Sequence, residues 1–189
     1  MKVGLLFGSF NPIHQGHIDI ANYFATNTDL KEVWLVVSPQ NPFKTKLKLL
    51  SPQIRLALVD IALQNEPNLK SCDIELAMPT PSYTIDTLKL LGKQYVNHQF
   101  YIIMGTDNLE KIETWKEYEQ ILSDFKLLVY PRKGHDGEIY KDHPNIQLAN
   151  SEFIEISATE IRGEIKRKEN SGMIPEMVWN TIMEKKHYQ

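Results

Sequence analysis

Residues 8–17 constrain the fold of this chain more than any other segment, because they form a glycine-rich turn with two histidines. The run before the turn, Val3 to Phe7, is typical of a strand buried on both faces, and Ile18 to Ala25 continues after it with helical spacing. A turn of this kind between a strand and a helix presents backbone N–H groups that favour a bound anion. The segment therefore predicts a phosphate site.

The turn differs from the common nucleotide-binding patterns. It has neither the Gly-Lys-Ser/Thr ending of a P-loop nor the spacing of the dinucleotide-binding Gly-x-Gly-x-x-Gly pattern. Gly8 would let a ligand approach the backbone, and His14 and His17 would add side-chain donors. A His-x-x-His pair also suits zinc, but a zinc site needs further ligands, and no other histidine or cysteine stands near in sequence. A phosphate remains the favoured ligand.

Composition narrows the class of protein. The chain has 189 residues, 42% hydrophobic and 24% charged, which fits one domain with a single core. A net charge of -3 argues against nonspecific nucleic-acid binding, and the single cysteine, Cys72, suits a reducing compartment. The N-terminal apolar run is too short for a signal peptide, and no stretch approaches the roughly 20 apolar residues of a membrane span. We expect a cytoplasmic protein that binds neither nucleic acid nor membrane.

Strand and helix patterns alternate along the chain. Helices are expected from a Ser51 cap, from a Ser82 cap and from near Pro175. The last helix offers a surface for a homo-oligomer contact, although packing on its own domain is the expected role. Strands are predicted at residues 3–7, 33–37, 72–77, 100–104, 125–130 and 153–156.

This alternation predicts an α/β fold class with a doubly wound parallel sheet and right-handed crossovers. Ligands of such sheets bind beyond the carboxyl ends of the strands. We expect residues 1–189 to form a single domain, with a helical C-terminal part from about residue 157.

Three further segments contain candidate binding residues. Ser157 and Glu160 form a capping box, and Thr159 and Arg162 would share one side of the helix that it starts. An arginine near a helix N-terminus can grip two phosphate oxygens, although the segment is also explained as a well-capped helix. The second segment is residues 38–44, which composition alone would assign to a proline-stiffened loop. The third is residues 81–84, taken together with residues 105–107 and 115, and its aromatic residues would ordinarily belong to the core.

These segments resemble a known family. Residues 8–17 are similar to the Gly-Ser/Thr-Phe-Asp/Asn-Pro-x-His-x-Gly-His signature of adenylyl- and cytidylyltransferases, relatives of class I tRNA synthetases. Residues 156–162 resemble the family's Ile-Ser-Ser-Thr-x-Ile-Arg, with Ala158 in place of the second serine. Lys44 matches the basic residue of the family's Pro-His-Lys, with Phe43 in place of the histidine. Pro-Ser-Tyr-Thr at 81–84 and Gly-x-Asp…Trp from 105 resemble bacterial nicotinate-mononucleotide adenylyltransferases rather than phosphopantetheine adenylyltransferase.

The resemblance implies a Rossmann-like nucleotidyltransferase fold that transfers AMP from ATP to nicotinate mononucleotide, giving deamido-NAD and pyrophosphate in NAD biosynthesis. The implied catalytic residues are His14, His17, Lys44 and Arg162. The implied ATP-binding residues are Gly8, Ser9, Phe10, His17, Gly105, Asp107, Ser157, Thr159 and Arg162. The implied mononucleotide-binding residues are Asn11, Lys44, Tyr83, Thr84 and Trp115, with Trp115 stacked on the pyridine ring and N–H groups near Thr84 and Trp115 receiving its carboxylate.

Magnesium is expected on the ATP phosphates, with water as its other ligand and no metal ligand from the chain, because Mg²⁺ keeps much of its water shell in nucleotide sites. Two alternatives stay open. One is an adenylyltransferase for another phosphate ester, namely nicotinamide mononucleotide or phosphopantetheine. The other is a non-catalytic nucleotide sensor, against which the presence of His14, His17 and Arg162 together argues, since a sensor needs no transition-state stabilisation.

Overall fold

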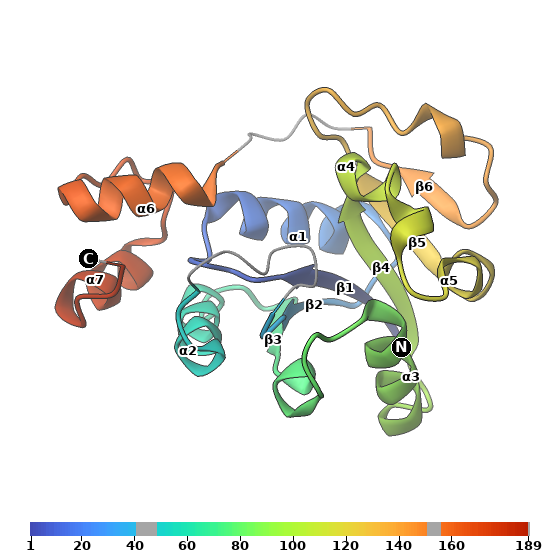
Figure 1. The fold of residues 1–189 in the computed structure, drawn as a ribbon, viewed down its shortest axis with the longest axis horizontal. Coiled ribbons are helices and arrows are strands. Elements are labelled where there is room, and N and C mark those ends of the chain that lie inside the picture. Colours follow the sequence, from blue (N-terminus) through green and yellow to red (C-terminus); the bar gives the residue numbers. More distant parts are fainter. Residues whose placement is uncertain (41–48, 151–155, 189) are drawn as a thin grey trace.

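The computed structural model describes residues 1–40, 49–150 and 156–188, and these form a six-stranded, all-parallel sheet (Figure 1). The strand order is β3-β2-β1-β4-β5-β6. The chain thus builds one half of the sheet outward from β1 and then crosses to the other side of β1. This is the doubly wound α/β fold that the sequence predicts, and its strand order reverses between β1 and β4. The strands are β1 (Lys2–Gly8), β2 (Glu32–Val37), β3 (Leu69–Cys72), β4 (Gln99–Gly105), β5 (Lys126–Tyr130) and β6 (Ile146–Leu148).

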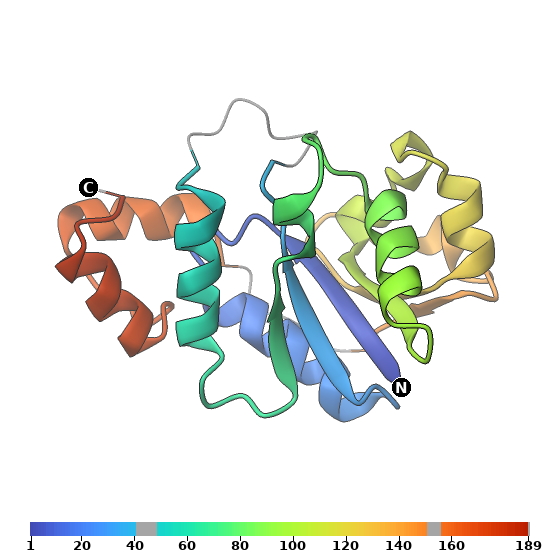
Figure 2. The same ribbon diagram turned by 90° about the horizontal axis from the view of Figure 1, so that it is seen from below.

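Helices follow most of the strands. The α-helices are α1 (Gln15–Asn27), α2 (Pro52–Ala62), α3 (Thr84–Gln94), α4 (Thr106–Leu109), α5 (Tyr118–Asp124), α6 (Ala158–Arg167) and α7 (Glu176–Glu184). The 3₁₀ turns are η1 (Ile74–Ala77), η2 (Ile112–Thr114) and η3 (Glu138–Tyr140). Figures 1 and 2 both show α6 and α7 together at one end of the molecule, with β6 toward the other. No described helix is both long enough and apolar enough to cross a lipid bilayer.

The two faces of the sheet support two apolar clusters, because successive strand residues point to opposite faces. In β2, Val33 and Leu35 join the cluster that also holds residues of α1, α2, α6 and α7. Trp34 and Val36 join the cluster that holds residues of α3 and α5. Central strands covered on both faces account for the unbroken apolar runs in the sequence. Buried side chains of α7 belong to the first cluster, so this helix packs on its own domain as expected.

The predicted third strand is wrong in its bounds. β3 ends at Cys72, and residues 74–77 form the turn η1. The alternation of Ile74, Glu75 and Leu76 is typical of a strand with an exposed carboxylate, but the Glu75 residue is only 2% exposed. Its carboxylate accepts hydrogen bonds from the hydroxyls of Ser82 (2.6 Å) and Thr87 (2.7 Å). These contacts from outside the segment stabilise the turn over the strand.

Two other local predictions also change. Tyr83, rather than Ser82, precedes α3, because the Ser82 hydroxyl is bonded to Glu75. The sixth strand is β6, which pairs with β5 through three residues, Leu127 with Ile146 at its start. Of the predicted strand 153–156, residues 153–155 lie outside the described part of the chain, and Ile156 is in no strand.

Arg55 of α2 joins the ends of two strands and is fully buried, at 0% exposure. Its Nε donates to the carbonyl of Leu50 at 2.9 Å, and its Nη2 donates to that of Pro39 at 3.0 Å. Nη1 donates to the carbonyls of Ser38, at 2.9 Å, and Ser9. Ser9 follows β1, Ser38 and Pro39 follow β2, and Leu50 precedes α2. A buried charge is tolerated only with full hydrogen bonding, which the fork of guanidinium donors supplies here.

Replacing Arg55 with methionine should lower the free energy of unfolding by about 3–5 kcal/mol, because each buried polar group left unpaired costs about 1–3 kcal/mol. Guanidinium chloride denaturation measures the loss. The control is Arg167→Met, which removes an exposed ion pair to Glu169 and should cost less than about 1 kcal/mol. Equal, small losses for both variants would contradict the role assigned to Arg55.

Candidate functional site

A cleft of about 680 Å³ opens beyond the carboxyl ends of β1 and β4, where the strand order reverses. Sheets of this topology bind ligands at this point. The cleft brings together segments far apart in sequence, from the turn after β1 to α6. Of the residues predicted for a site, it is lined by Gly8, Ser9, Phe10, Asn11, His17, Tyr83, Thr84, Asp107, Trp115, Thr159 and Arg162.

Three other predicted residues, His14, Gly105 and Ser157, do not line the cleft. His14 is buried behind the wall, 5% exposed, and Gly105 ends β4 beneath Asp107. Ser157 caps α6, its Oγ accepting from the backbone N–H of Glu160 at 3.4 Å. Lys44, together with Phe43, lies outside the described residues.

The two histidines stack against each other where α1 begins. Their ring centroids are 3.6 Å apart at an interplanar angle of 27°. The backbone N–H of His14 donates to Nδ1 of His17 at 3.3 Å. When Nδ1 accepts, the proton of the neutral ring sits on Nε2, so His17 can offer an N–H toward a phosphate in the cleft.

His14 stays neutral at physiological pH. Burial, with a smaller contribution from the positive charge of Arg132, lowers the pKa of His14 from 6.5 to about 4. Within the described part of the chain, its buried Nδ1 has no hydrogen-bond partner. His14 therefore supports the position of His17 by stacking, and it does so as a neutral ring rather than as a fixed cation.

Gly8 lines the cleft and also makes room for the side chain of Phe10. A Cβ placed on Gly8 would lie 2.7 Å from Cζ of Phe10, closer than real Cβ atoms come. Phe10 has a left-handed backbone, with φ of 43°, which turns its ring back over Gly8. The edge of this ring meets His17, with centroids 4.9 Å apart. The glycine thus lets Phe10 support the histidine that faces the cleft.

Arg162 ties α6 to the turn after β1. Its Nη1 donates to the carbonyl of Asn11 at 2.8 Å, and its Nη2 donates to the Thr159 hydroxyl at 3.0 Å. Thr159 and Arg162 therefore lie on one side of the first turn of α6, as the spacing predicts. The Asn11 side chain also serves the fold, because its Oδ1 accepts from the N–H of Leu50 at 3.2 Å. The turn after β1 is thus fixed from two sides.

The far end of the cleft lies between α3 and the segment after η2. Thr84 starts α3, and in the described structure the preceding Tyr83 makes no side-chain cap, so the first N–H groups of the helix point out as donors. Trp115 packs against the second apolar cluster and contributes to the cleft wall. A flat ring with an acceptor group fits this combination of an indole and helix N–H donors.

Asp107 and Arg132 both line the cleft, where their charged groups face each other. Arg132 Nε lies 4.0 Å from Oδ1 of Asp107, and its guanidinium stacks on Tyr130, 5.1 Å from the ring centroid. A Cβ on Gly105 would collide with the Asp107 carboxylate and lie 2.9 Å from Cγ of Arg132. Gly105 is therefore needed for the position of both charged side chains.

Sequence reasoning missed several residues of this region, among them Arg55, Glu75 and Arg132. Arg132 stands two residues after β5, and the rule that ligands bind beyond strand ends would have singled it out. Arg55 shares the apolar stripe of α2 with Leu58 and Val59, an unusual place for a charge. The sequence around Glu75 does not indicate that this residue is buried, because its hydrogen-bond partners, Ser82 and Thr87, come from another segment.

Other reactive groups do not enter the site. Burial raises the pKa of the Cys72 thiol to about 11, which leaves the cysteine protonated and unreactive at neutral pH. Among the described residues, no three histidine, cysteine or acidic side chains are grouped so as to hold a metal ion.

Comparison with known proteins gives consistent matches. Residues 5–164 match the family model described as cytidylyltransferase-like. A probable nicotinate-nucleotide adenylyltransferase from Cytophaga hutchinsonii is 44% identical over 189 residues, covering 100% of this chain and 98% of the relative. A second such protein, from Flavobacterium psychrophilum, is 44% identical over 192 residues, and the alignment covers 100% of both chains.

A solved structure shares the fold. It is the Plasmodium falciparum nicotinic acid mononucleotide adenylyltransferase complexed with NaAD, with a TM-score of 0.84 and 21% identity. The superposition covers 99% of this chain and 97% of that one. A second structure of that protein, complexed with APC, has a TM-score of 0.82.

The lowered pKa of His14 makes folding sensitive to acid. Because the unfolded state binds the proton more readily, the contribution of this residue is complete above pH 6.5 and is lost as the pH falls toward about 4. The loss amounts to about 3 kcal/mol. His14→Gln should remove this part of the pH dependence, measured as the difference between the wild-type and variant unfolding free energies from pH 7 to 4. If the unfolding free energies of the wild type and the variant changed equally with pH, His14 would not be buried as a neutral ring.

Proposed function

Because the chain belongs to the cytidylyltransferase-like family and is similar along its full length to nicotinate-nucleotide adenylyltransferases, we propose that it joins AMP from ATP to nicotinate mononucleotide. The products are deamido-NAD and pyrophosphate, so the reaction is a step of NAD biosynthesis. One observation carries the assignment: a single cleft combines phosphate donors at one end with an indole and helix N–H donors at the other. In a dinucleotide such as deamido-NAD, the bridging phosphates are joined through a ribose to the pyridine ring, which matches this pair of sites.

The reaction needs no nucleophile from the protein. An oxygen of the mononucleotide phosphate attacks the α-phosphorus of ATP, and the bond from that phosphorus to the β-phosphate oxygen breaks as pyrophosphate leaves. The protein aligns the two substrates, which can lower a barrier by about 7–11 kcal/mol, and it stabilises the growing charge.

The ATP end is assigned to the turn after β1 and to α6. His17 would donate from Nε2 to the α-phosphate, with His14 behind it, and Arg162 with Lys44 would attract the departing pyrophosphate. Gly8, Ser9, Phe10 and the Gly105–Asp107 turn would hold the adenosine, with Asp107 on a ribose hydroxyl. Ser157 and Thr159 would act through the start of α6, where an anion is favoured.

The acceptor end is assigned to Asn11, Tyr83, Thr84 and Trp115. Trp115 would stack on the pyridine ring, and N–H groups near Thr84 and Trp115 would receive its carboxylate. The observed partners of Asn11 give it a positioning role, because Oδ1 is already bonded to Leu50.

Magnesium would arrive as part of the MgATP substrate. Its preferred ligands are phosphate oxygens and water, and acidic side chains such as Asp107 would at most meet its water shell. We further propose that residues 1–189 act as one nucleotidyltransferase domain, whose helical part from about residue 157 supplies Arg162, and that the protein works in the cytoplasm, where the free thiol of Cys72 would stay reduced.

The test is pyrophosphate release from ATP with nicotinate mononucleotide, nicotinamide mononucleotide and phosphopantetheine as acceptors. We expect kcat/KM to favour the acid over its amide by at least about 100-fold, because N–H donors that a ligand covers reject an N–H₂ group that arrives in place of an acceptor. Equal kcat/KM for acid and amide would contradict the carboxylate site, and release with phosphopantetheine alone would contradict the proposed substrate.

Replacing His17 with alanine should lower kcat by about 100-fold or more, since its donor acts on charge that develops in the transition state. The dissociation constant of ATP should change far less. The control is His143→Ala, because His143 does not line the cleft. A His17 variant with wild-type kcat would remove this residue from the mechanism.

A further inference from the structure

The first turn of α3 carries a negative charge beside the proposed carboxylate site. Asp86 stands two residues after Thr84, whose N–H is one of the donors assigned to the pyridine carboxylate. An acidic residue in this turn stabilises the helix through its dipole. The same charge would repel the carboxylate of the acceptor, since exposed like charges repel over several ångströms.

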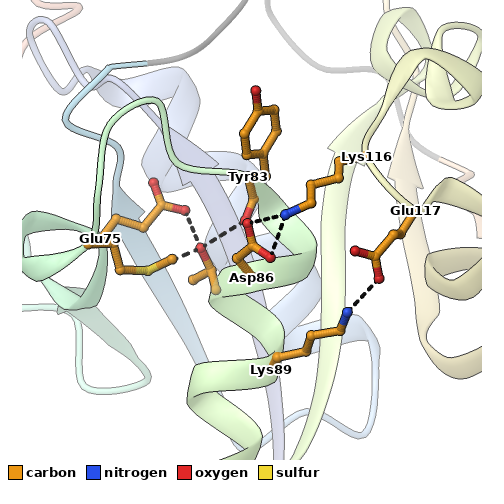
Figure 3. A network of polar contacts seen from close by, with 8 residues as sticks. Glu75, Tyr83, Asp86, Lys89, Lys116 and Glu117 are labelled. Carbon is orange, nitrogen blue, oxygen red and sulfur yellow. Dashed lines mark hydrogen bonds and ion pairs between the residues drawn. The ribbon is translucent and has the colours of Figure 1, made fainter.

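Lys116 cancels this charge in the structure. Its Nζ lies 3.0 and 2.8 Å from the two carboxylate oxygens of Asp86 and 5.3 Å from the centre of the Tyr83 ring (Figure 3). Lys116 directly follows Trp115, and both Lys116 and Tyr83 are among the residues that line the cleft. The ammonium group thus lies between the start of α3 and the segment that supplies the indole.

We propose that Lys116 is a specificity-determining residue: it neutralises Asp86 in the first turn of α3 and thereby lets the acceptor end of the cleft take a negatively charged pyridine carboxylate. The inference rests on the proposed function and extends it, because it assigns part of the preference for acid over amide to a side chain. Without Lys116, the charge of Asp86 would oppose the acid and leave the neutral amide unaffected.

A second ion pair supplies a matched control. Lys89 of α3 pairs with Glu117, so this pair connects the same two segments as Lys116 and Asp86 (Figure 3). Neither Lys89 nor Glu117 lines the cleft. If the ion pairs served only to join α3 to the segment after η2, losing either one would have the same effect on catalysis.

The experiment measures kcat/KM for nicotinate and nicotinamide mononucleotide on the same preparation of each variant, and it compares their ratio. Lys116→Gln should lower the ratio of acid to amide about three- to tenfold, as expected for one uncompensated charge at a partly exposed site. Lys116→Arg should retain the ratio, and the double variant Lys116→Gln/Asp86→Asn should restore it. Lys89→Gln should leave it unchanged. Because the ratio comes from one preparation, partial unfolding of a variant cancels.

An unchanged ratio in Lys116→Gln would overturn the inference, as would an equal loss for both acceptors or an equal change in Lys89→Gln. Failure of the double variant to restore the ratio would also overturn it, because the effect would then not arise from the charge of Asp86. These outcomes leave transfer to nicotinate mononucleotide by the wild-type protein intact. Absence of that transfer would instead contradict the proposed function, and the inference with it.

Discussion

The buried guanidinium of Arg55 is the contact on which the site depends. The carbonyls it binds lie after β1, after β2 and before α2, at the edge of the sheet where the cleft opens. Backbone carbonyls at the ends of parallel strands have lost their ladder partners and need other donors. A single planar group with five donors meets this need, so the turn that leads into α1 and His17 is held by a residue that does not line the cleft.

From this anchor the site is assembled by contacts between distant segments. The side chain of Asn11 accepts a hydrogen bond from the N–H of Leu50, and its carbonyl accepts one from Arg162. The segment before α2 and the helix α6 are therefore both bound to the turn after β1. At the acceptor end, the carboxylate of Glu75 accepts hydrogen bonds from Ser82 and from Thr87 of α3, so it fixes the start of this helix in the same way. Each end of the cleft thus has a buried polar residue, Arg55 or Glu75, that fixes the segments around it.

Much of this architecture is predictable from the sequence, and the exceptions have physical causes. The strands β1, β2, β4 and β5 and the inner face of α3 follow from apolar periodicity, and the residues of the cleft follow from the rule for strand ends and from motif resemblance. The predictions at residues 72–77 and Ser82 are wrong for one reason, namely that Glu75 is satisfied by hydroxyls several residues away. β6 is short and contains a polar residue, so its pairing with β5, rather than its own pattern, defines it. Position 8 requires glycine because the ring of Phe10 occupies the space of a Cβ there, and the spacing of residues in the sequence does not reveal this contact.

The central claim is that one cleft holds both halves of a dinucleotide, with its phosphates between the turn after β1 and α6. A crystal structure with deamido-NAD bound tests it most directly. The account predicts the pyridine ring against Trp115, its carboxylate at the start of α3, and the bridging phosphates within hydrogen-bond distance of His17. A ligand bound with its phosphates remote from His17, or with its pyridine ring away from Trp115, would contradict it.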